Sequence, residues 1–237
     1  MILPTTFDVF SALTDSRSGG SGFLQSASAS RGWPTSGLQI YDEWDARNKE
    51  LHRLTTQWMS FSDLSTRAMR ATLTHLELPE EVSEQLSIEL LEGMVDWPLW
   101  PDVTTESLGA LGAARLGLLS NIDDRLLQGT AVMRLGVFDP DCIITSQKAR
   151  AYKPAAALYH RAAELLGPFV HVASSARDVR GAVSAGIPCV RLARPGHSLD
   201  ASGPTPQWTA DSVSALPQLL GAASAWGHGR SEASGSS

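Results

Sequence analysis

Short apolar runs alternate with amphipathic segments along most of the chain, and this alternation predicts an α/β protein. The apolar runs predict strands that begin at Thr5 and recur at 114–121, 142–145, 169–173 and 188–192. Apolar residues at three- and four-residue steps predict helices at 104–111, 123–128, 154–166, 178–185 and from Asp211 onward. Strands that alternate with helices form a parallel sheet covered on both faces, so we expect a Rossmann-like core.

Residues 37–95 depart from this alternation, because three amphipathic helical patterns follow one another with no strand between them. Asp63 is the expected cap of the second, and Pro79 the expected first turn of the third. The Gly- and Ser-rich residues before them predict a loop. The expected organisation is a core of residues 1–15 and 96–225, a loop and inserted α-helical cap over 16–95, and a disordered tail over 226–237.

Composition restricts the partners of the protein. With 237 residues, 43% hydrophobic and 19% charged, the chain is typical of a soluble globular protein. A net charge of -6 and scattered cations argue against nucleic acid. Two cysteines in apolar runs predict reduced core residues, and no run is long enough for a membrane helix or signal peptide, so we expect a cytoplasmic protein with no membrane partner. The cap segment with Trp58 and Met59 could provide a homodimer face.

Polar side chains follow four of the predicted strands at the point where each strand ends. They are Asp8, Ser120, Asn121, Lys153, Ser174, Ser175 and Asp178. Because the carboxyl ends of parallel strands meet at one edge of a sheet, we expect these side chains to gather there. Each serine or aspartate could instead simply cap a helix. Four strand ends that converge favour a functional site.

The same residues carry a resemblance to the haloacid dehalogenase superfamily, and within it to the type II L-2-haloacid dehalogenases. The motifs occur in the family's order and cover nearly the whole chain: Asp8 with Phe10 and Asp15, then Leu119-Ser120-Asn121, then Tyr152-Lys153-Pro154 with Tyr159, then 173–188. The resemblance implies the haloacid dehalogenase fold with its cap domain.

The resemblance also implies a hydrolase with a covalent aspartyl-ester intermediate, in which the Asp8 carboxylate is the nucleophile. Lys153 would hold that carboxylate, and Asp178 would orient Lys153 or activate water. The substrate would contact Phe10, Arg47, Ser120, Asn121, Tyr159, Ser174 and Ser175. Among these, Arg47 of the cap would receive the halide, although a solvated helix face is the more ordinary place for an arginine.

Phe10 favours carbon–halogen chemistry over phosphate chemistry. In the superfamily's phosphatases this position is an Asp that protonates the leaving oxygen, and Mg²⁺-dependent members have an acid where this chain has Ser174. A halide leaves without a proton or a metal, so we expect no metal or other cofactor and a small 2-haloacid or related electrophile as substrate. A Mg²⁺-dependent phosphatase and a non-catalytic binding protein on this fold are the alternatives.

Three residues depart from the dehalogenase pattern: Ala12 replaces a Thr, Ser175 replaces an Asn and Arg177 replaces a Trp. All three fall in the set that binds the substrate carboxylate and lines the pocket, whereas the nucleophile is kept.

Overall fold

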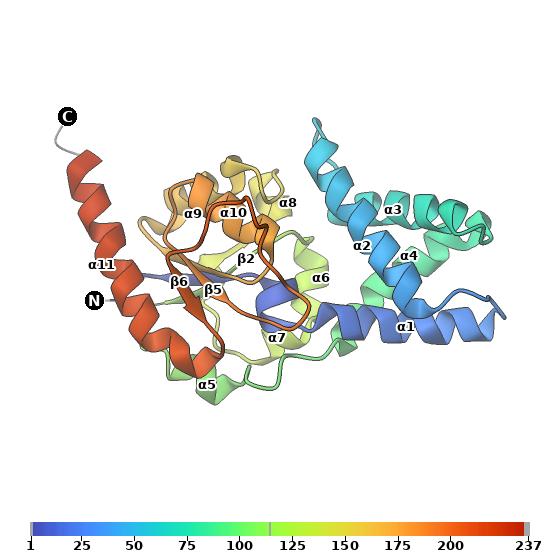
Figure 1. Ribbon diagram of the computed structural model, residues 1–237, viewed down its shortest axis with the longest axis horizontal. Helices are drawn as coiled ribbons and strands as arrows, with labels where there is room; N and C mark the ends of the chain where they lie inside the picture. Colours follow the sequence, from blue (N-terminus) through green and yellow to red (C-terminus); the bar gives the residue numbers. More distant parts are fainter. Residues whose placement is uncertain (1, 114, 235–237) are drawn as a thin grey trace. The chain divides into compact units, whose positions relative to one another are not determined.

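The expected parallel sheet is present in the computed structural model, which describes residues 2–113 and 115–234 (Figure 1). Every strand pair is parallel, in the order β3-β2-β1-β4-β5-β6. The strands are β1 (Thr5–Phe7), β2 (Leu116–Ser120), β3 (Ile143–Thr145), β4 (Val170–Ala173), β5 (Cys189–Leu192) and β6 (Trp208–Ala210). Strand β6, which the sequence pattern missed, is a three-residue edge strand, and Ala114, the expected start of β2, lies outside the described residues.

Further helices lie before β2, between most of the later strands and after β6 in the sequence (Figure 1). They are α5 (Thr105–Gly109), α6 (Asp124–Gly129), α7 (Ala131–Arg134), α8 (Ser146–Ala149), α9 (Ala156–Leu166), α10 (Ala176–Ser184) and α11 (Leu216–Ser234). The apolar faces of α9 and α10 bury Leu158, Tyr159 and Val179 against Leu119 and Ile144 of the sheet. Helix α11 corrects the expected tail, since the chain from residue 226 to 234 is helical; residues 235–237 lie outside the described part.

Strand β1 is shorter than the apolar run that predicted it. The chain leaves the sheet after Phe7 and forms a five-residue π-helical turn, η1 (Val9–Leu13), in which the amide of Thr14 donates to the carbonyl of Val9 at 2.9 Å. Such turns are rare and frequently mark functional positions. Asp8 is the residue at which the strand becomes the turn.

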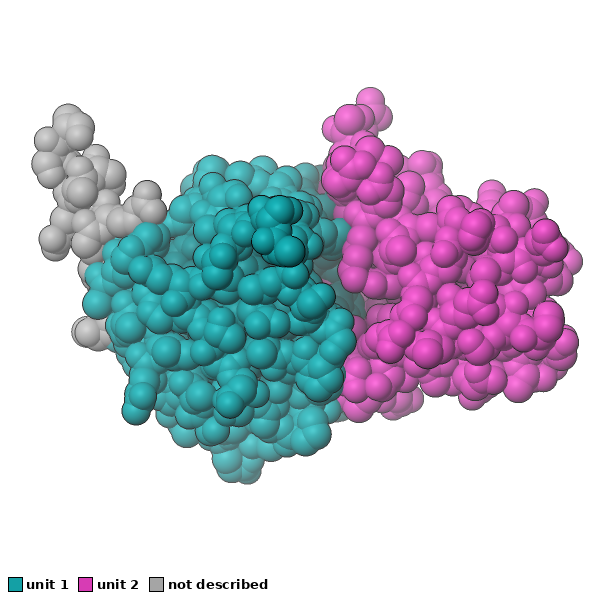
Figure 2. Space-filling model, viewed as in Figure 1, with its two compact units in different colours: residues 1–14, 99–121, 132–237 teal, residues 15–98, 122–131 magenta. Residues whose placement is uncertain are grey.

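The chain divides into two compact units, coloured separately in Figure 2. The first contains the sheet and comprises the residues up to Thr14, 99–121 and 132 onward. The second comprises 15–98 and 122–131. Its helices are α1 (Ser16–Ser30), α2 (Gly37–Leu54), α3 (Phe61–His75) and α4 (Ser83–Glu92), together with α6.

Helix α1 lies where the sequence predicted a loop. Asp15 caps it, since its carboxylate accepts a hydrogen bond from the amide of Ser18 at 3.1 Å. Its small residues serve close packing rather than flexibility, because a Cβ on Gly20 would lie 2.2 Å from the Tyr41 ring of α2. Composition alone therefore gave the wrong structure here, since glycine permits both loops and tight helix contacts.

Asp123 explains why residues 122–131, assigned to the core from sequence, belong to the helical unit. Its carboxylate accepts hydrogen bonds from the backbone amides of Phe61 and Ser62, both at 2.9 Å, and thereby binds the N-terminus of α3. The N-cap of α3 is Ser60, which accepts from the amide of Asp63 at 3.0 Å, rather than Asp63 as expected.

Residues 13–15 and 98–100 run side by side where the chain leaves and re-enters the sheet-containing unit. Thr14 and Leu99 form an antiparallel bridge. The amide of Asp15 donates to the carbonyl of Pro98 at 2.9 Å, and the amide of Trp100 donates to the carbonyl of Leu13 at 3.0 Å. The two connections are therefore held together by backbone hydrogen bonds.

Candidate active site

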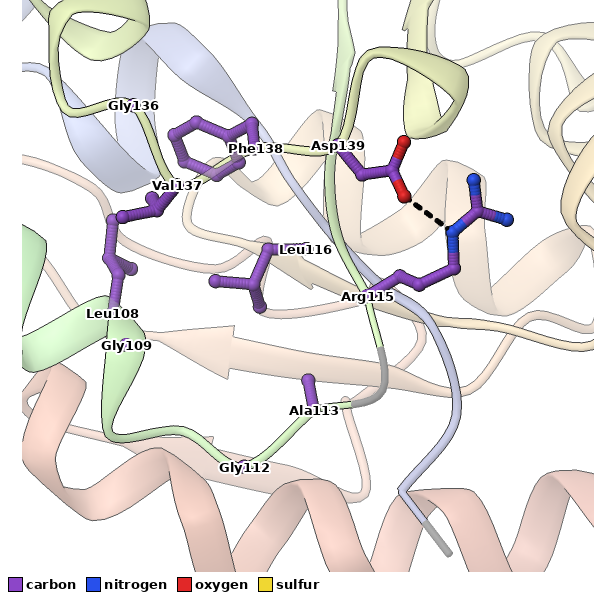
Figure 3. A pocket seen from close by; sticks show the side chains of 10 residues that line it. All are labelled: Leu108, Gly109, Gly112, Ala113, Arg115, Leu116, Gly136, Val137, Phe138 and Asp139. Atoms are coloured by element: carbon purple, nitrogen blue, oxygen red, sulfur yellow. Dashed lines mark hydrogen bonds and ion pairs between the residues drawn. The ribbon is translucent and has the colours of Figure 1, made fainter.

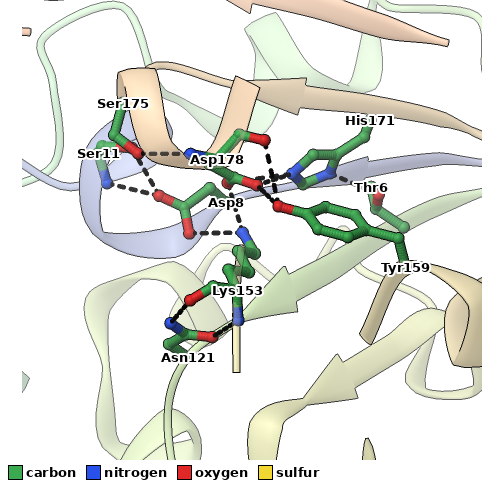
Figure 4. Close-up of polar contacts among 9 residues, drawn as sticks. All are labelled: Thr6, Asp8, Ser11, Asn121, Lys153, Tyr159, His171, Ser175 and Asp178. Atoms are coloured by element: carbon green, nitrogen blue, oxygen red, sulfur yellow. Dashed lines mark hydrogen bonds and ion pairs between the residues drawn. The ribbon is translucent and has the colours of Figure 1, made fainter. Parts of the chain in front are cut away.

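The Asp8 carboxylate lies at the carboxyl end of β1, buried and held by three donors (Figure 4). Its Oδ2 atom accepts from the amide of Ser11 at 3.0 Å and from the Ser11 hydroxyl at 2.6 Å. Its Oδ1 atom accepts from the Lys153 ammonium at 2.9 Å. The turn η1 makes both Ser11 contacts, because it brings the third residue after Asp8 back over the carboxylate. A buried carboxylate requires such partners.

Lys153 lies between the two carboxylates that the sequence predicted. Its Nζ atom is 2.9 Å from Asp8 Oδ1 and 2.5 Å from Asp178 Oδ2, and its side chain is 3% exposed. Burial alone would lower the pKa of Lys153, but the charges of Asp178 and Asp8 outweigh burial and raise it. Burial likewise opposes the charge of Asp178, yet Lys153 and then His171 hold its pKa well below the usual range. Both groups are therefore held in their ionised forms.

The carboxylate of Asp178 accepts hydrogen bonds from two elements besides Lys153. The Tyr159 hydroxyl of α9 lies 2.6 Å from Oδ1, and Nε2 of His171 on β4 lies 3.1 Å from both oxygens. Tyr159 is fully buried, and burial and then Asp178 raise its pKa. This hydroxyl therefore positions Asp178, and the expected contact of Tyr159 with substrate stays a prediction.

Asn121 holds the backbone of Lys153 with both ends of its side-chain amide. Its Oδ1 accepts from the amide of Lys153 at 2.8 Å, and its Nδ2 donates to the Lys153 carbonyl at 3.2 Å. Both ends of the Asn121 amide thus place the backbone of the lysine, and the expected contact of Asn121 with substrate stays a prediction. The backbone of Lys153, in the loop between α8 and α9, is therefore tied to the residue that follows β2.

Two buried hydroxyls lie beside β1. Phe7 pairs with Leu118 of β2 and Val172 of β4, so Ser120 and Ser174 each stand two residues beyond the pairing, on either side of Asp8. Their Oγ atoms are buried, and among the described residues neither has a hydrogen-bond partner. Unpaired buried hydroxyls are costly, so a ligand is the expected partner. Ser175 instead caps α10, and its hydroxyl accepts from the Asp178 amide at 3.4 Å.

Phe10 and Arg47 complete the predicted set. Phe10 is the second residue of η1 and is partly exposed, and it offers no proton at this position. Arg47 lies on α2 in the helical unit, where its Nη2 atom is 2.5 Å from Glu43 Oε1. The interaction of Arg47 with a halide stays a prediction.

Arg194, which the sequence analysis missed, supports the turn that follows Asp8. Its Nε and Nη2 atoms donate to the carbonyl of Ala12 at 3.1 and 3.0 Å, and its Nη1 atom pairs with Asp102 at 2.7 Å. The guanidinium also lies over the Trp100 ring, 5.4 Å from the ring centre. Ser11 and His171 were missed too. Only the position of Ser11, three residues after a strand-terminal Asp, offered a signal, because that spacing permits a cap hydrogen bond.

A separate pocket of about 520 Å³ opens at the amino end of β2, away from the strand ends that carry Asp8 and Ser120 (Figure 3). Its walls are mostly glycine and apolar residues, with Arg115 paired to Asp139 at 2.7 Å. This pocket contains none of the predicted site residues.

Within residues 2–113 and 115–234, no cluster of three or more His, Cys, Asp or Glu side chains is arranged to hold a metal ion. In the same part of the chain, no helix combines the length and apolar character needed to cross a bilayer.

An open parallel sheet with a lysine-bridged pair of aspartates at its carboxyl edge is the arrangement expected of the haloacid dehalogenase fold. The comparisons confirm this fold. The L-2-haloacid dehalogenase of Xanthobacter autotrophicus superposes with a TM-score of 0.78 at 22% identity, over 94% of this chain and 99% of that one. A second structure of that enzyme, with chloropropionic acid covalently bound, gives 0.77 at 21% identity, over 93% and 98% of the two chains.

Two curated relatives are also haloacid dehalogenases. The chain is 26% identical over 197 residues to the (S)-2-haloacid dehalogenase of Pseudomonas sp. strain YL, covering 79% of this chain and 84% of the relative. It is 27% identical over 201 residues to haloacetate dehalogenase H-2 of Moraxella sp. strain B, covering 79% and 87%. No family model matches the chain. The resemblance drawn from the four motifs, to L-2-haloacid dehalogenases, is thereby confirmed.

Proposed function

We propose that this protein is a hydrolase that cleaves the carbon–halogen bond of a small 2-halocarboxylic acid through an aspartyl ester on Asp8. The proposal rests chiefly on one observation: a buried carboxylate held by Lys153 and Ser11 ends β1, and the two strands that pair with β1 end at Ser120 and just before Ser174, whose buried hydroxyls have no partner among the described residues. The curated relatives are haloacid dehalogenases, which supports the same reaction.

In the first step an Asp8 oxygen attacks the carbon that carries the halogen. The new C–O bond forms as the C–X bond breaks, and the electron pair leaves with the halide. Oδ2 keeps two donors from Ser11 and becomes the ester carbonyl oxygen. Oδ1 therefore forms the bond to the substrate. The hydroxyls of Ser120 and Ser174 would receive the substrate carboxylate.

In the second step water attacks Cγ of the ester, and negative charge develops on Oδ2. The amide and hydroxyl of Ser11 stabilise this charge as an oxyanion hole. Oδ1 leaves in the product alcohol, and Lys153, which contacts this atom, donates the proton it needs. Of the two protons of the attacking water, one returns to Lys153 and the other is released when the new Asp8 carboxyl ionises.

The reaction as proposed needs no metal. The Lys153 ammonium already occupies the position between the two carboxylates and offsets their charge. Phe10 also fits a leaving group that departs without a proton, since a phosphate ester needs an acid there.

We expect the purified protein to release chloride or bromide from 2-chloropropionate and the haloacetates at a rate unchanged by EDTA. Released halide is titrated against time, and p-nitrophenyl phosphate with Mg²⁺ is tested in parallel. Phosphatase turnover abolished by EDTA, without halide release, would instead favour the Mg²⁺-dependent alternative. Neither activity, with no adduct on Asp8 in intact mass spectra, would favour a binding protein.

Ser11→Ala should lower kcat for halide release by about ten- to a hundredfold, because it removes one charge-assisted hydrogen bond of the oxyanion hole and keeps the backbone amide. The ester on Asp8 should accumulate in rapid-quench mass spectra, since the hydrolytic step loses most. Ser18→Ala, on the exposed side of α1, is the matched control and should keep the parental rate. Equal rates for Ser11→Ala and the control would remove Ser11 from the mechanism.

A further inference from the structure

His171 is a buried titratable group that the two steps above do not use. It lies on β4 next to the central strand and has no exposed surface. Its Nδ1 atom lies 2.9 Å from the Thr6 hydroxyl of β1, and its Nε2 atom lies 3.1 Å from each Asp178 oxygen (Figure 4). An apolar side chain would be the usual choice at a buried strand position such as this one, so the two polar contacts of the histidine need an explanation.

The two contacts determine where the ring carries its hydrogen. Nε2 faces both oxygens of a carboxylate, so a bare nitrogen lone pair there would be repelled and a hydrogen is required. The Thr6 hydroxyl can then donate to Nδ1 and satisfy the other ring nitrogen. The Thr6 contact holds the ring in the orientation in which Nε2 of His171 donates to Asp178.

The contacts also determine what Asp178 can do. Oδ1 accepts from Tyr159 and His171, and Oδ2 accepts from Lys153 and His171. The carboxylate is 2% exposed, and its lone pairs are directed at these three donors. A carboxylate with all its acceptor directions occupied is suited to holding a lysine and poorly suited to taking a proton from water.

We propose that His171 is a positioning residue for the hydrolase, which, oriented by Thr6, fixes Asp178 as the anchor that keeps Lys153 against Asp8. This proposal rests on the proposed function for its effect on turnover, but the hydrogen position on the ring can be tested without turnover. Of the two roles that the family resemblance implies for Asp178, the geometry points to orientation of Lys153.

Other ionisable groups face the same ring or its partner. Tyr159 of α9 stacks edge-on to His171 with ring centres 5.9 Å apart, and Cys189 of β5 is its neighbour in the strand register. Burial, and then Asp178, raises the pKa of Cys189, and burial also raises the pKa of Tyr159, so both stay neutral around pH 7. Lys153 and Asp8 lie beyond Asp178. Asp178 is therefore the charged group that a substitution of His171 affects directly.

The kinetic test compares His171→Leu, His171→Gln and Thr6→Val with the parent on 2-chloropropionate. His171→Leu should lower kcat about ten- to a hundredfold, the effect of one hydrogen bond to a charged group, and leave KM near its parental value. The acid limb of the pH profile of kcat for this variant should move to higher pH, because loss of a hydrogen-bond donor raises the pKa of Asp178. His171→Gln, whose amide nitrogen can reach the place of Nε2, should recover most of the rate. Thr6→Val should give a smaller change in the same direction.

A parental pH profile and kcat in His171→Leu would overturn the proposal, as would a folded His171→Gln no faster than His171→Leu. If the leucine variant does not fold, Thr6→Val decides, because it replaces a hydroxyl by a methyl group of similar size; a parental rate there would also overturn the proposal.

The structural test uses histidine labelled with ¹⁵N in the intact parent protein. His171→Gln removes one of the six histidine signals and thereby assigns it. We expect Nε2 of His171 to carry hydrogen throughout the pH range in which the protein is folded. A bare Nε2 would overturn the proposal. A hydrogen on Nε2 in a protein that releases no halide would overturn the proposed function alone, so the two failures are distinguishable.

Discussion

Asp8→Asn is expected to abolish halide release, with kcat lower by about four to six orders of magnitude, the usual effect of removing a covalent nucleophile. An amide oxygen does not displace a halide at a useful rate, so neither step can occur. The shape of the side chain is unchanged, and the protein should stay folded. Intact mass spectrometry after rapid quenching should show an adduct on Asp8 in the parent and none in the variant.

Asp15→Asn is the matched control for this loss. Asp15 caps α1 through the amide of Ser18, and asparagine is an equally good cap, so activity should be parental. If Asp8→Asn retained substantial turnover, or if the adduct mapped to another residue, the aspartyl-ester mechanism would be wrong.

Lys153→Met is expected to lower the free energy of unfolding by about 3–5 kcal/mol, because it leaves two buried carboxylates without their cation. Urea unfolding at pH 7 measures the change. Lys148→Met, at an exposed lysine nearby, should change stability far less. The double variant Lys153→Met/Asp178→Asn should recover part of the loss, since one of the uncompensated charges is gone. No recovery would mean that packing rather than charge accounts for the loss.

The pH dependence of this loss has a definite sign. The pKa of Asp178 is lowered in the folded protein, so its contribution is present above the ordinary carboxyl pKa and disappears as pH falls through the lowered value. The pKa of Lys153 is raised, so its contribution is present below the ordinary lysine pKa and disappears as pH rises through the raised value. The contribution of the Lys153–Asp178 pair to the stability of the parent should therefore be constant from about pH 4 to about pH 10 and be lost outside this window.

The sheet could be predicted from sequence because its strands are nearly pure apolar runs, which are typical of strands buried on both faces. Strand β6 was missed because it is short and at the sheet edge, where an apolar run is not required. Helix α1 was missed because a segment rich in glycine and serine can form either a loop or a tightly packed helix, and composition does not distinguish the two. The contact of Gly20 with Tyr41 that distinguishes the two is a tertiary one.

The positions of Asp8, Lys153 and Asp178 could be predicted because parallel strand ends necessarily meet. Their partners could not. Ser11 reaches Asp8 only because the chain turns as a π-helix, and His171 reaches Asp178 only across the packing of β4 against α10. The contacts of Tyr159 with Asp178 and of Asn121 with Lys153 could not be predicted, because sequence shows that a polar group is present but not where it points.

The paired connections at 13–15 and 98–100 bear on how such a chain can be assembled. Because Thr14 and Leu99 are bridged, the two ends of the intervening segment are adjacent. The backbone hydrogen bonds between these ends offset part of the entropic cost of closing that long loop. Replacing residues 15–98 by a short turn would therefore change the backbone path of the sheet-containing unit little. A segment with this kind of entry can be lengthened, exchanged or rebuilt during evolution while the residues that hold Asp8 stay where they are.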